Sequence, residues 1–441
     1  MFKKVFPLSL ILFLRFLGLF LVLPVLSVYA LDLEGATPFL VGVIVGGYAL
    51  TQAIFQVPFG TMSDKIGRKP TILFGLLIFL VGSLICAYSD NIYMLMFGRF
   101  LQGAGAIGSV VTAMIADLVE EKTRGHAMAI MGGFIAMSFA FAMALGPVIA
   151  SHYGISTIFI ITAVLALVAI VVLFTKVPTP PKIKHIYHND TKTADIIKDP
   201  NLLGMIIINA MQKGLMTAAF VIIPVFLTKP EYGFNWEKSE LWMVYVPAMI
   251  AGLIAMGPAA VFGEKKNIPK QIFMLSIVLF TASFVMMGLT TSSSVFVAAV
   301  IFFFIAFNMM EPLVQSMISK FAKVHQKGAA LGIANSAAYF ATFLGGTFAG
   351  LYLDASSRAT LGLTIGAIGL AWLVWTALKM QNPLRYSHLV IPEDEVDFEK
   401  LKNLEHEHIA EWFINETEKV VVIKYASEKL QEDELKGKII K

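Results

Sequence analysis

The sequence predicts an all-α membrane protein with twelve transmembrane helices in two six-helix halves, followed by a small C-terminal α/β domain. Three observations lead to this fold class. The 441-residue chain is 57% hydrophobic and only 15% charged, whereas soluble globular chains carry about 25% charged residues. Apolar runs of bilayer-spanning length recur along most of the chain, and the polar segments between them alternate in their content of Lys and Arg.

The apolar runs can be compared with the length that a bilayer requires, because a helix needs about 20 apolar residues to cross it. Twelve runs qualify: residues 5–30, 38–62, 70–88, 92–115, 126–150, 155–176, 201–227, 239–262, 271–290, 294–318, 329–353 and 358–379. The first run has a basic start, as a signal peptide does. No small-residue cleavage site closes a short apolar core, so we interpret it as an uncleaved first helix.

The distribution of Lys and Arg orients these spans. Nearly all Lys and Arg residues of the expected loops lie on one side, and the other side carries only Lys229, Lys238 and Arg358. Cytoplasmic loops of membrane proteins are enriched in Lys and Arg. The sequence therefore predicts a multi-pass protein of the bacterial inner membrane with both termini in the cytoplasm.

One local repeat indicates two parallel halves. Met114 is followed eleven residues later by Gly125, after Arg124, and Met317 is followed at the same spacing by Gly328, after Lys327. Parallel repeats about an axis along the membrane normal are common among transporters. We expect a first half at residues 1–176, a cytoplasmic linker at 177–200, a second half at 201–380 and a soluble domain at 385–441.

The soluble domain has its own pattern of elements. His388–Ile391 is expected to be a short strand, Glu395–Leu404 a helix, and residues 408–414 and 419–425 a hairpin that turns at Asn415 to Thr417. Ser427 is expected to cap a last helix. This β-α-β-β-α order resembles a ferredoxin-like module.

Residues Gly60 to Lys69 read G-T-M-S-D-K-I-G-R-K and join two apolar runs. This pattern resembles the signature loop between helices 2 and 3 of the major facilitator superfamily (MFS). Two further stretches resemble that family: L-G-x5-P-V at Leu17–Val25 and R-x-x-Q-G-x-G-A at Arg99–Ala106. Gly146-Pro147 resembles the antiporter signature, although Ala150 and Ser151 stand where the family has glycines. The resemblance implies the MFS fold, with a likeness to drug:proton antiporters and to a facilitator that carries a ferredoxin-like tail.

The signature loop predicts a conformational latch. Asp64 ends the second span, Arg68 lies one turn beyond, and Asp117 ends the fourth span nearby. Such a cluster can hold cytoplasmic helix ends together in one state and release them in another; the alternative is a static ion pair. The residues assigned to the latch are Gly60, Asp64, Gly67, Arg68, Lys69 and Asp117, and those assigned to close helix packing are Gly103, Gly105, Gly146 and Pro147.

Ionisable residues inside the membrane are candidates for function. Glu311 is the one acid well inside an apolar run, and Arg15, Lys213 and Arg99 are the cations there. We expect Glu311 to carry proton coupling, with Arg15 or Lys213 as its partner; the alternative is a permanent ion pair that fixes helix packing. Polar residues that line a cavity, or that only join helices, are Gln52, Gln56, Gln102, Asn209, Gln212, Asn308 and Gln315.

Other function classes find little support in the sequence. Gly103–Gly108 spells G-x-G-x-x-G, but no strand precedes it, so it is not a dinucleotide site. Glu405–His408 offers too few ligands for a metal. A single cysteine, Cys86, excludes internal disulfides. We expect no enzyme activity, cofactor, metal or nucleic acid.

The expected function is proton-coupled efflux of a small, partly apolar molecule by a secondary transporter. The expected partners are this substrate, protons and the lipid bilayer, and the protein is expected to be a monomer. The alternatives are a membrane sensor that signals through the C-terminal domain and a channel without proton coupling.

Overall fold

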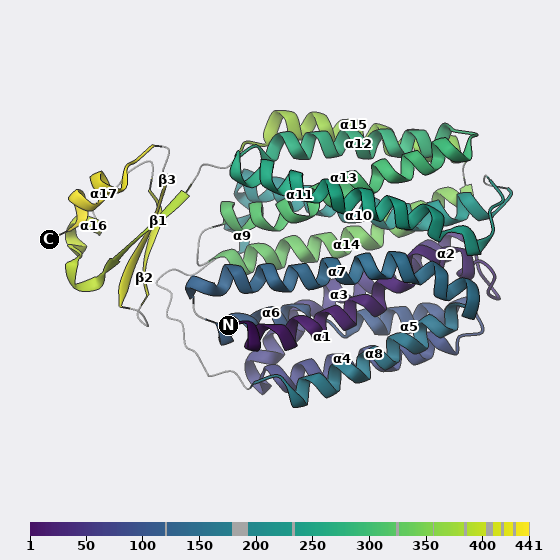
Figure 1. Cartoon of the computed structure of the whole chain (residues 1–441), viewed down its shortest axis with the longest axis horizontal. Coiled ribbons are helices and arrows are strands. Elements are labelled where there is room, and N and C mark those ends of the chain that lie inside the picture. The colour runs from purple at the N-terminus through teal and green to yellow at the C-terminus, as the bar shows by residue number, and fades with distance from the viewer. Residues whose placement is uncertain are drawn as a thin grey trace.

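The computed structural model consists of a long bundle of helices and a small α/β tail beyond one end of it (Figure 1). It describes residues 1–119, 121–178, 193–231, 234–322, 326–355, 357–382, 386–402, 409–415, 419–426 and 429–440. The central part of the expected linker, the turn after Asn415, Ser427 and the run Glu405–His408 lie outside these ranges. We name the bundle end that carries Met1 and the tail the terminal end, and the opposite end the distal end.

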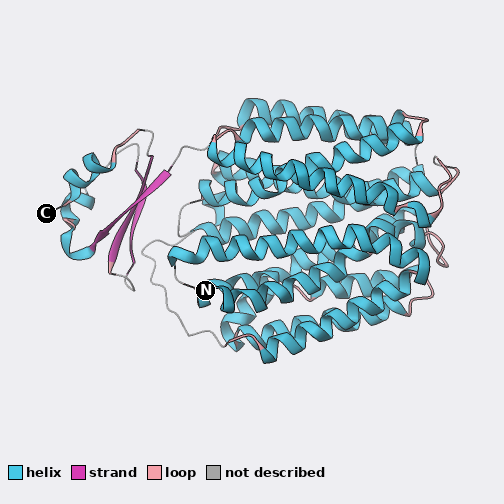
Figure 2. Ribbon diagram, in the orientation of Figure 1, coloured by secondary structure: helices cyan, strands magenta, loops and turns pink. Residues whose placement is uncertain are grey.

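The bundle is built of helices that run back and forth between these two ends (Figure 2). The first part comprises α1 (Phe2–Leu21), α2 (Leu23–Ala30), α3 (Pro38–Ile66), α4 (Arg68–Ala87), α5 (Ile92–Ala104), α6 (Gly108–Leu118), α7 (Glu121–Tyr153) and α8 (Ile155–Thr175). The second comprises α9 (Thr193–Lys198), α10 (Pro200–Thr228), the 3₁₀ turn η1 (Lys238–Glu240), α11 (Trp242–Lys265), α12 (Pro269–Leu289), α13 (Ser293–Phe321), α14 (Lys327–Ala355) and α15 (Arg358–Lys379).

In the described part of the chain, eleven helical segments are long and apolar enough to cross a membrane. They match the expected spans in order, except for the span expected at residues 329–353. Helix α14 covers that stretch with 29 residues, but it is rich in glycine and alanine and carries polar residues such as Asn335 and Thr342. It packs against both α3 and α10, where small residues permit close approach. A twelfth span therefore stays a prediction that rests on α14.

Two expected spans are each divided into two helices. The first span divides at Val22, two residues before Pro24, because proline cannot donate the backbone hydrogen bond that a continuous helix requires. The fourth divides at residues 105–107. A side chain at Gly105 would overlap the carbonyl oxygen of Gly75 in α4, so close contact with the neighbouring helix accompanies this break.

Glycines allow the helices of the first half to approach each other closely. A side chain at Gly103 would overlap the carbonyl oxygen of Tyr48 in α3, and one at Gly146 would overlap that of Leu21 in α1. Pro147 follows within α7. In lipid, where apolar surface gains little from burial between helices, such small-residue contacts hold helices together by van der Waals packing.

The tail forms a three-stranded sheet with helices on one face. Its elements are β1 (Tyr386–Pro392), the 3₁₀ turn η3 (Glu393–Glu395), α16 (Phe398–Lys402), β2 (Ile409–Asn415), β3 (Val420–Ala426) and α17 (Glu432–Ile439). The strand order is β1-β3-β2, and β3 is antiparallel to both neighbours. This β-α-β-β-α order was expected from the sequence, and its outer strands are parallel, as in a split β-α-β unit.

The tail has a hydrophobic core separate from that of the bundle. Alternate residues such as Leu389, Val421 and Ile423 face this core. Lys424, only 5% exposed, lies between the core residues Ile423 and Tyr425 in the sequence. It donates to the carbonyl oxygens of Lys320 (3.3 Å) and Ala322 (3.4 Å) at the end of α13. The tail thus places a cation at a helix C-terminus, where the helix dipole favours one.

These contacts predict that the tail stabilises the last turn of α13. A cation at a helix C-terminus is worth about 0.3–1 kcal/mol, so Lys424→Gln should speed backbone hydrogen exchange in that turn by roughly two- to fivefold. Hydrogen–deuterium exchange with mass spectrometry measures this rate. Lys429→Gln changes the same charge at an exposed position of the tail and serves as the control.

Removal of residues 385–441 should leave the helical bundle folded, because the bundle core does not include the tail. Circular dichroism and size-exclusion chromatography of the truncated protein test this. Loss of helical signal or aggregation of the truncated protein would show that the tail is needed for folding.

Candidate functional site

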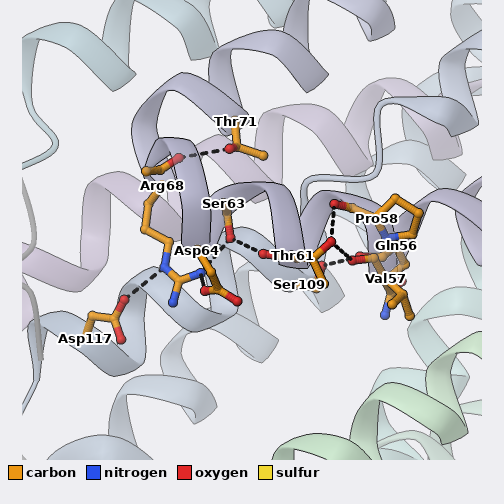
Figure 3. Close-up of polar contacts among 12 residues, drawn as sticks. Gln56, Val57, Pro58, Thr61, Ser63, Asp64, Arg68, Thr71, Ser109 and Asp117 are labelled. Carbon is orange, nitrogen blue, oxygen red and sulfur yellow. Dashed lines mark hydrogen bonds and ion pairs between the residues drawn. The ribbon is translucent and has the colours of Figure 1, made fainter. Parts of the chain in front are cut away.

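The signature loop places three charged residues together at the terminal end (Figure 3). Arg68 Nε donates to Asp117 Oδ2 at 2.9 Å, and Arg68 Nη1 lies 2.6 Å from both Asp64 Oδ1 and Ser63 Oγ. The turn between α3 and α4 is a single residue, Gly67, with φ +102°. Because a residue with a side chain is strained at that φ, glycine suits this turn.

This cluster connects the ends of α3, α4 and α6, which all belong to the first half. The predicted latch residues Gly60 and Lys69 lie beside it in the sequence, and Gly60 accepts a hydrogen bond from the Ser63 hydroxyl at 2.6 Å. Arg68 and Asp117 are largely shielded, with side-chain exposures of 18% and 24%, whereas Asp64 is 65% exposed. The Arg68–Asp117 contact is therefore the less screened of the two ion pairs.

The second half has a polar cluster at the corresponding place, which the sequence analysis missed. Glu264 at the end of α11 accepts hydrogen bonds from Ser316 and Lys320 on α13. Lys320 is also the residue whose carbonyl oxygen accepts from Lys424 of the tail. The terminal end of each half is thus fastened by its own ion pair.

Glu311 lies in contact with Lys213 near the middle of the bundle. Lys213 Nζ is 2.7 Å from Oε2 and 2.9 Å from Oε1 of Glu311, and Gln212 Nε2 donates to Oε2 at 3.0 Å. Lys213 also lies 4.8 Å from the ring centre of Phe307. The two charged side chains are 22% and 35% exposed, so this pair is neither sealed in the protein nor fully solvated.

Arg15 contacts a different set of residues. It is fully buried and donates to Gln52 Oε1 at 3.2 Å, while the rings of Phe16 and Phe79 lie 5.4 and 5.6 Å from its guanidinium carbon. Of the two partners considered for Glu311, the structure therefore brings Lys213 to it. Tyr339 on α14 lies near Gln52, and α3 and α14, which belong to different halves, pack against each other.

Arg99 is likewise fully buried. It donates to Gln102 Oε1 at 2.8 Å and lies 4.8 Å from the ring centre of Tyr48. Gln102 in turn donates to Ser83 on α4 at 2.9 Å. These contacts join α3, α4 and α5. Neither Lys213 nor Glu311 is among them.

The other polar residues predicted for a cavity mostly join helices in this conformation. Asn209 donates to the Ala334 carbonyl, Gln212 to the Phe307 carbonyl, and Asn308 to the Phe304 carbonyl within its own helix. Like these, Gln56 is buried. Gln315 is exposed and bonds to Asn335 at 3.3 Å. Their place in a substrate cavity stays a prediction.

An ion-pair cluster at the distal end joins the two halves, and the sequence analysis did not identify it. Asp32, between α2 and α3, lies 3.0 Å from Lys229 Nζ and also pairs with Lys238. We name Asp32, Lys229 and Lys238 the distal clamp. Lys238 also lies 4.3 Å from the ring centre of Tyr29. Partial burial alone would raise the pKa of Asp32, but hydrogen bonds and charge from the two lysines outweigh it and hold the pKa below its usual 3.8.

The two halves also pack tightly around this clamp. A side chain at Gly42 would meet Gly350 Cα at 2.8 Å, and one at Gly46 would meet Phe343 Cα at the same distance. Ser27 on α2 donates to the Phe220 carbonyl of α10 at 3.2 Å. The distal parts of α2, α3, α10 and α14 are therefore in direct contact.

Comparison with known proteins agrees with this geometry. A sequence model of the family described as "Major Facilitator Superfamily" matches residues 8–346. Inner membrane transport protein YajR of Escherichia coli (strain K12) is 34% identical over 94% of this chain and 92% of its own. Quinolone resistance protein NorA of Staphylococcus aureus (strain MRSA252) is 27% identical over 86% and 97%. The crystal structure of a D-xylose-proton symporter has the same fold, with a TM-score of 0.70 at 14% identity, over 87% of this chain and 99% of its own.

The distal clamp yields a prediction about pH and charge. Asp32→Asn removes both ion pairs, and since an exposed pair is worth about 0.2–1 kcal/mol, the equilibrium between joined and separated distal ends should shift by no more than about fivefold per pair. Distances between spin labels at Ala36 and Glu237 measure this equilibrium. Because the pKa of Asp32 is lowered, its contribution is complete above the usual aspartate pKa and is lost only as the pH falls through the lowered value.

Between pH 5 and 8 the label distances of the unmodified protein should therefore not change through Asp32. Glu34→Gln, which removes an exposed acid two residues away, should leave them unchanged as well. Identical distance distributions for Asp32→Asn and the unmodified protein would show that the glycine contacts alone hold the distal ends together.

Proposed function

The chain belongs to the major facilitator superfamily, and from that membership we propose that it exports a small, partly apolar molecule in exchange for protons by alternating access. It is a multi-pass membrane transporter and not an enzyme. We place the terminal end in the cytoplasm, because the expected loops at that end carry nearly all the Lys and Arg residues. The first half, linker, second half and tail keep the bounds 1–176, 177–200, 201–380 and 385–441.

The Lys213–Glu311 ion pair is the observation that supports proton coupling. Lys213 is close to the middle of the 29-residue α10, and Glu311 lies just past the middle of α13, toward the terminal end. We therefore place the pair within the membrane. Protonation of Glu311 removes one of the two charges and leaves the other without its partner. Since an unpaired charge inside a membrane is costly, proton binding can shift the population between two arrangements of the helices around the pair.

Alternating access is supported by the difference between the two ends of the bundle. At the distal end the halves are joined by the clamp and by glycine contacts. Toward the terminal end, helices of both halves carry glycines with open space beside them: Gly60 on α3, Gly132 on α7, Gly257 on α11 and Gly332 on α14. We assign this conformation to the inward-facing state, in which substrate would enter from the cytoplasm.

Efflux of a partly apolar molecule is supported by the relatives and by the aromatic residues next to the charged pair. One relative is named a quinolone resistance protein. Phe139 of the first half lies 6.1 Å from Phe220 and 5.6 Å from Phe307 of the second, between ring centres. Phe307 in turn contacts Lys213. A ligand bound between the halves at this level would contact these phenylalanine rings and the charged pair.

The sensor alternative is not favoured, since the relatives are named as transport and resistance proteins. The tail contacts α13 beside the Glu264–Lys320 pair, which suits a modulator of transport. If removal of residues 385–441 left flux unchanged but abolished a cellular response, the sensor alternative would be favoured instead.

The latch prediction concerns Arg68. Arg68→Ala removes two part-exposed ion pairs worth up to about 1 kcal/mol each, so the balance between transport states should shift by up to roughly 30-fold and turnover should fall. Accessibility labelling of cysteines placed at the two ends measures the balance. Lys65→Ala, which removes a neighbouring exposed cation, is the control. Equal labelling in both variants would show that the cluster is a static ion pair and not a latch.

Glu311→Gln tests proton coupling, because it mimics the protonated side chain at the same size. In proteoliposomes with a fluorescent quinolone as the probe, the variant should lose the response of flux to an imposed pH gradient and retain substrate exchange. Lys213→Ala should also alter the pH response, whereas Arg15→Ala should not do so through Glu311.

The matched control is Glu264→Gln, which removes an acid near the end of a neighbouring helix. Proton uptake on addition of the quinolone should be lost in Glu311→Gln and kept in Glu264→Gln. Equal proton uptake by Glu311→Gln and the unmodified protein would make Glu311 a packing residue.

A further inference from the structure

A groove opens at the terminal end between the start of α1 and the end of α8. Its volume is about 450 Å³. Its walls are apolar, from Phe2, Phe6 and Leu10 on α1 and Val172 on α8, and Lys3 and Lys176 supply its charges. Both lysines are exposed, so their ammonium groups are accessible to a ligand that enters from the membrane boundary.

The groove lies beside a membrane-facing surface. Helix α8 exposes large apolar side chains at helical spacing along its length, namely Ile160, Val164, Leu167, Val171 and Phe174. On α1, Phe2 and Phe6 are exposed as well. Exposed apolar stripes on a membrane-spanning helix are lipid contacts, since water would not solvate them. The groove is therefore open to lipids of the surrounding bilayer.

We propose that this groove binds an anionic phospholipid of the leaflet at the terminal end. An acyl chain would occupy the apolar walls, and the phosphate would lie between Lys3 and Lys176. Basic pockets at helix ends on the cytoplasmic side suit acidic lipid headgroups, and Lys is attracted to such headgroups more than to zwitterionic ones. The site is separate from the Lys213–Glu311 pair, so it does not depend on the proposed substrate or on proton coupling.

Lys4 is a basic residue close to the groove that does not line it, so it can separate the effect of the groove from that of basic charge at this end of the bundle. It adjoins Lys3 in the sequence, but its Nζ donates to the Leu118 carbonyl at the end of α6, at 3.4 Å, and it does not line the groove. Lys379 ends α15 on the same side of the membrane. The double variant Lys4→Gln/Lys379→Gln therefore removes the same charge from the same end without touching the groove.

Native mass spectrometry of the purified full-length protein tests the proposal with phosphatidylglycerol and phosphatidylcholine of identical acyl chains. The unmodified protein should retain phosphatidylglycerol more tightly. A lysine near acidic headgroups contributes about fivefold in affinity, so Lys3→Gln/Lys176→Gln should reduce phosphatidylglycerol binding by roughly 25-fold and leave phosphatidylcholine binding unchanged. The Lys4→Gln/Lys379→Gln control should bind as the unmodified protein does.

Two further arms separate the ligand sources and guard against misfolding. Glycerol 3-phosphate, which has the headgroup charge but no acyl chain, should not bind at the same concentrations. Leu10→Trp, which fills the groove and keeps both lysines, should weaken binding of both lipids, and melting curves confirm that each variant is folded. Equal retention of the two lipids by the unmodified protein, or equal phosphatidylglycerol binding by the two double variants, would overturn the proposal.

Discussion

Lipid tails offer no hydrogen bonds, so every charge inside this bundle must be satisfied by other protein groups. The chain meets this constraint in two ways and only in part, because Nε and Nη1 of Arg15 and Nε and Nη2 of Arg99 have no hydrogen-bond partner among the described residues. Lys213 and Glu311 neutralise each other across α10 and α13, whereas Arg15 and Arg99 are held by glutamine oxygens and aromatic rings. Both ways require helices to lie close enough for side chains to meet. The glycines that replace bulkier residues at the crossings, such as Gly103 against Tyr48, make that approach possible.

The contact between the halves combines weak and tight interactions, which suits a contact that must open. The distal clamp is part exposed, and such ion pairs are worth little individually. The glycine contacts between α3 and α14 give close van der Waals packing, which is lost as soon as the surfaces separate by a fraction of an ångström. Among the described residues, the contact between the halves contains no deeply buried ion pair whose rupture would make opening very slow. By contrast, the clusters at the terminal end, Arg68 with Asp64 and Asp117 and Lys320 with Glu264, lie within single halves, so they would affect the balance between states through the packing of helices inside each half.

Sequence periodicity and charge were sufficient for eleven spans in the described part of the chain, for the order of elements in the tail and for the contact between Asp64 and Arg68, because these depend on local spacing: Asp64 and Arg68 are one helical turn apart wherever the helix points. The latch role of this cluster stays a prediction. The partner of Glu311 could not be chosen from the sequence, since Arg15 and Lys213 have similar depths and only the rotation and packing of the helices decides which one meets it. The division of the fourth span at residues 105–107 accompanies a close contact between Gly105 and Gly75 of another helix, which the sequence of the span alone does not show. Asp32 was missed because it lies in a short loop without a motif. The one available signal was that Lys229 and Lys238 are rare cations on the distal side.

The proposed transport cycle gains a physical basis from the charges near the middle of the bundle. While Glu311 is ionised, Lys213 is paired, and in the described part of the chain the two buried arginines rely on neutral partners. Neutralising Glu311 leaves Lys213 against Phe307, a cation–π contact that is worth less than the ion pair it replaces. In the proposed cycle Lys213, without its partner, would turn toward water or a ligand, since its side chain is already 22% exposed. Since Phe307 also contacts Phe139 of the opposite half, a shift of Lys213 over that ring would alter the aromatic contact between the halves. In the proposed cycle, Phe307 would thereby connect proton binding to the separation of the halves.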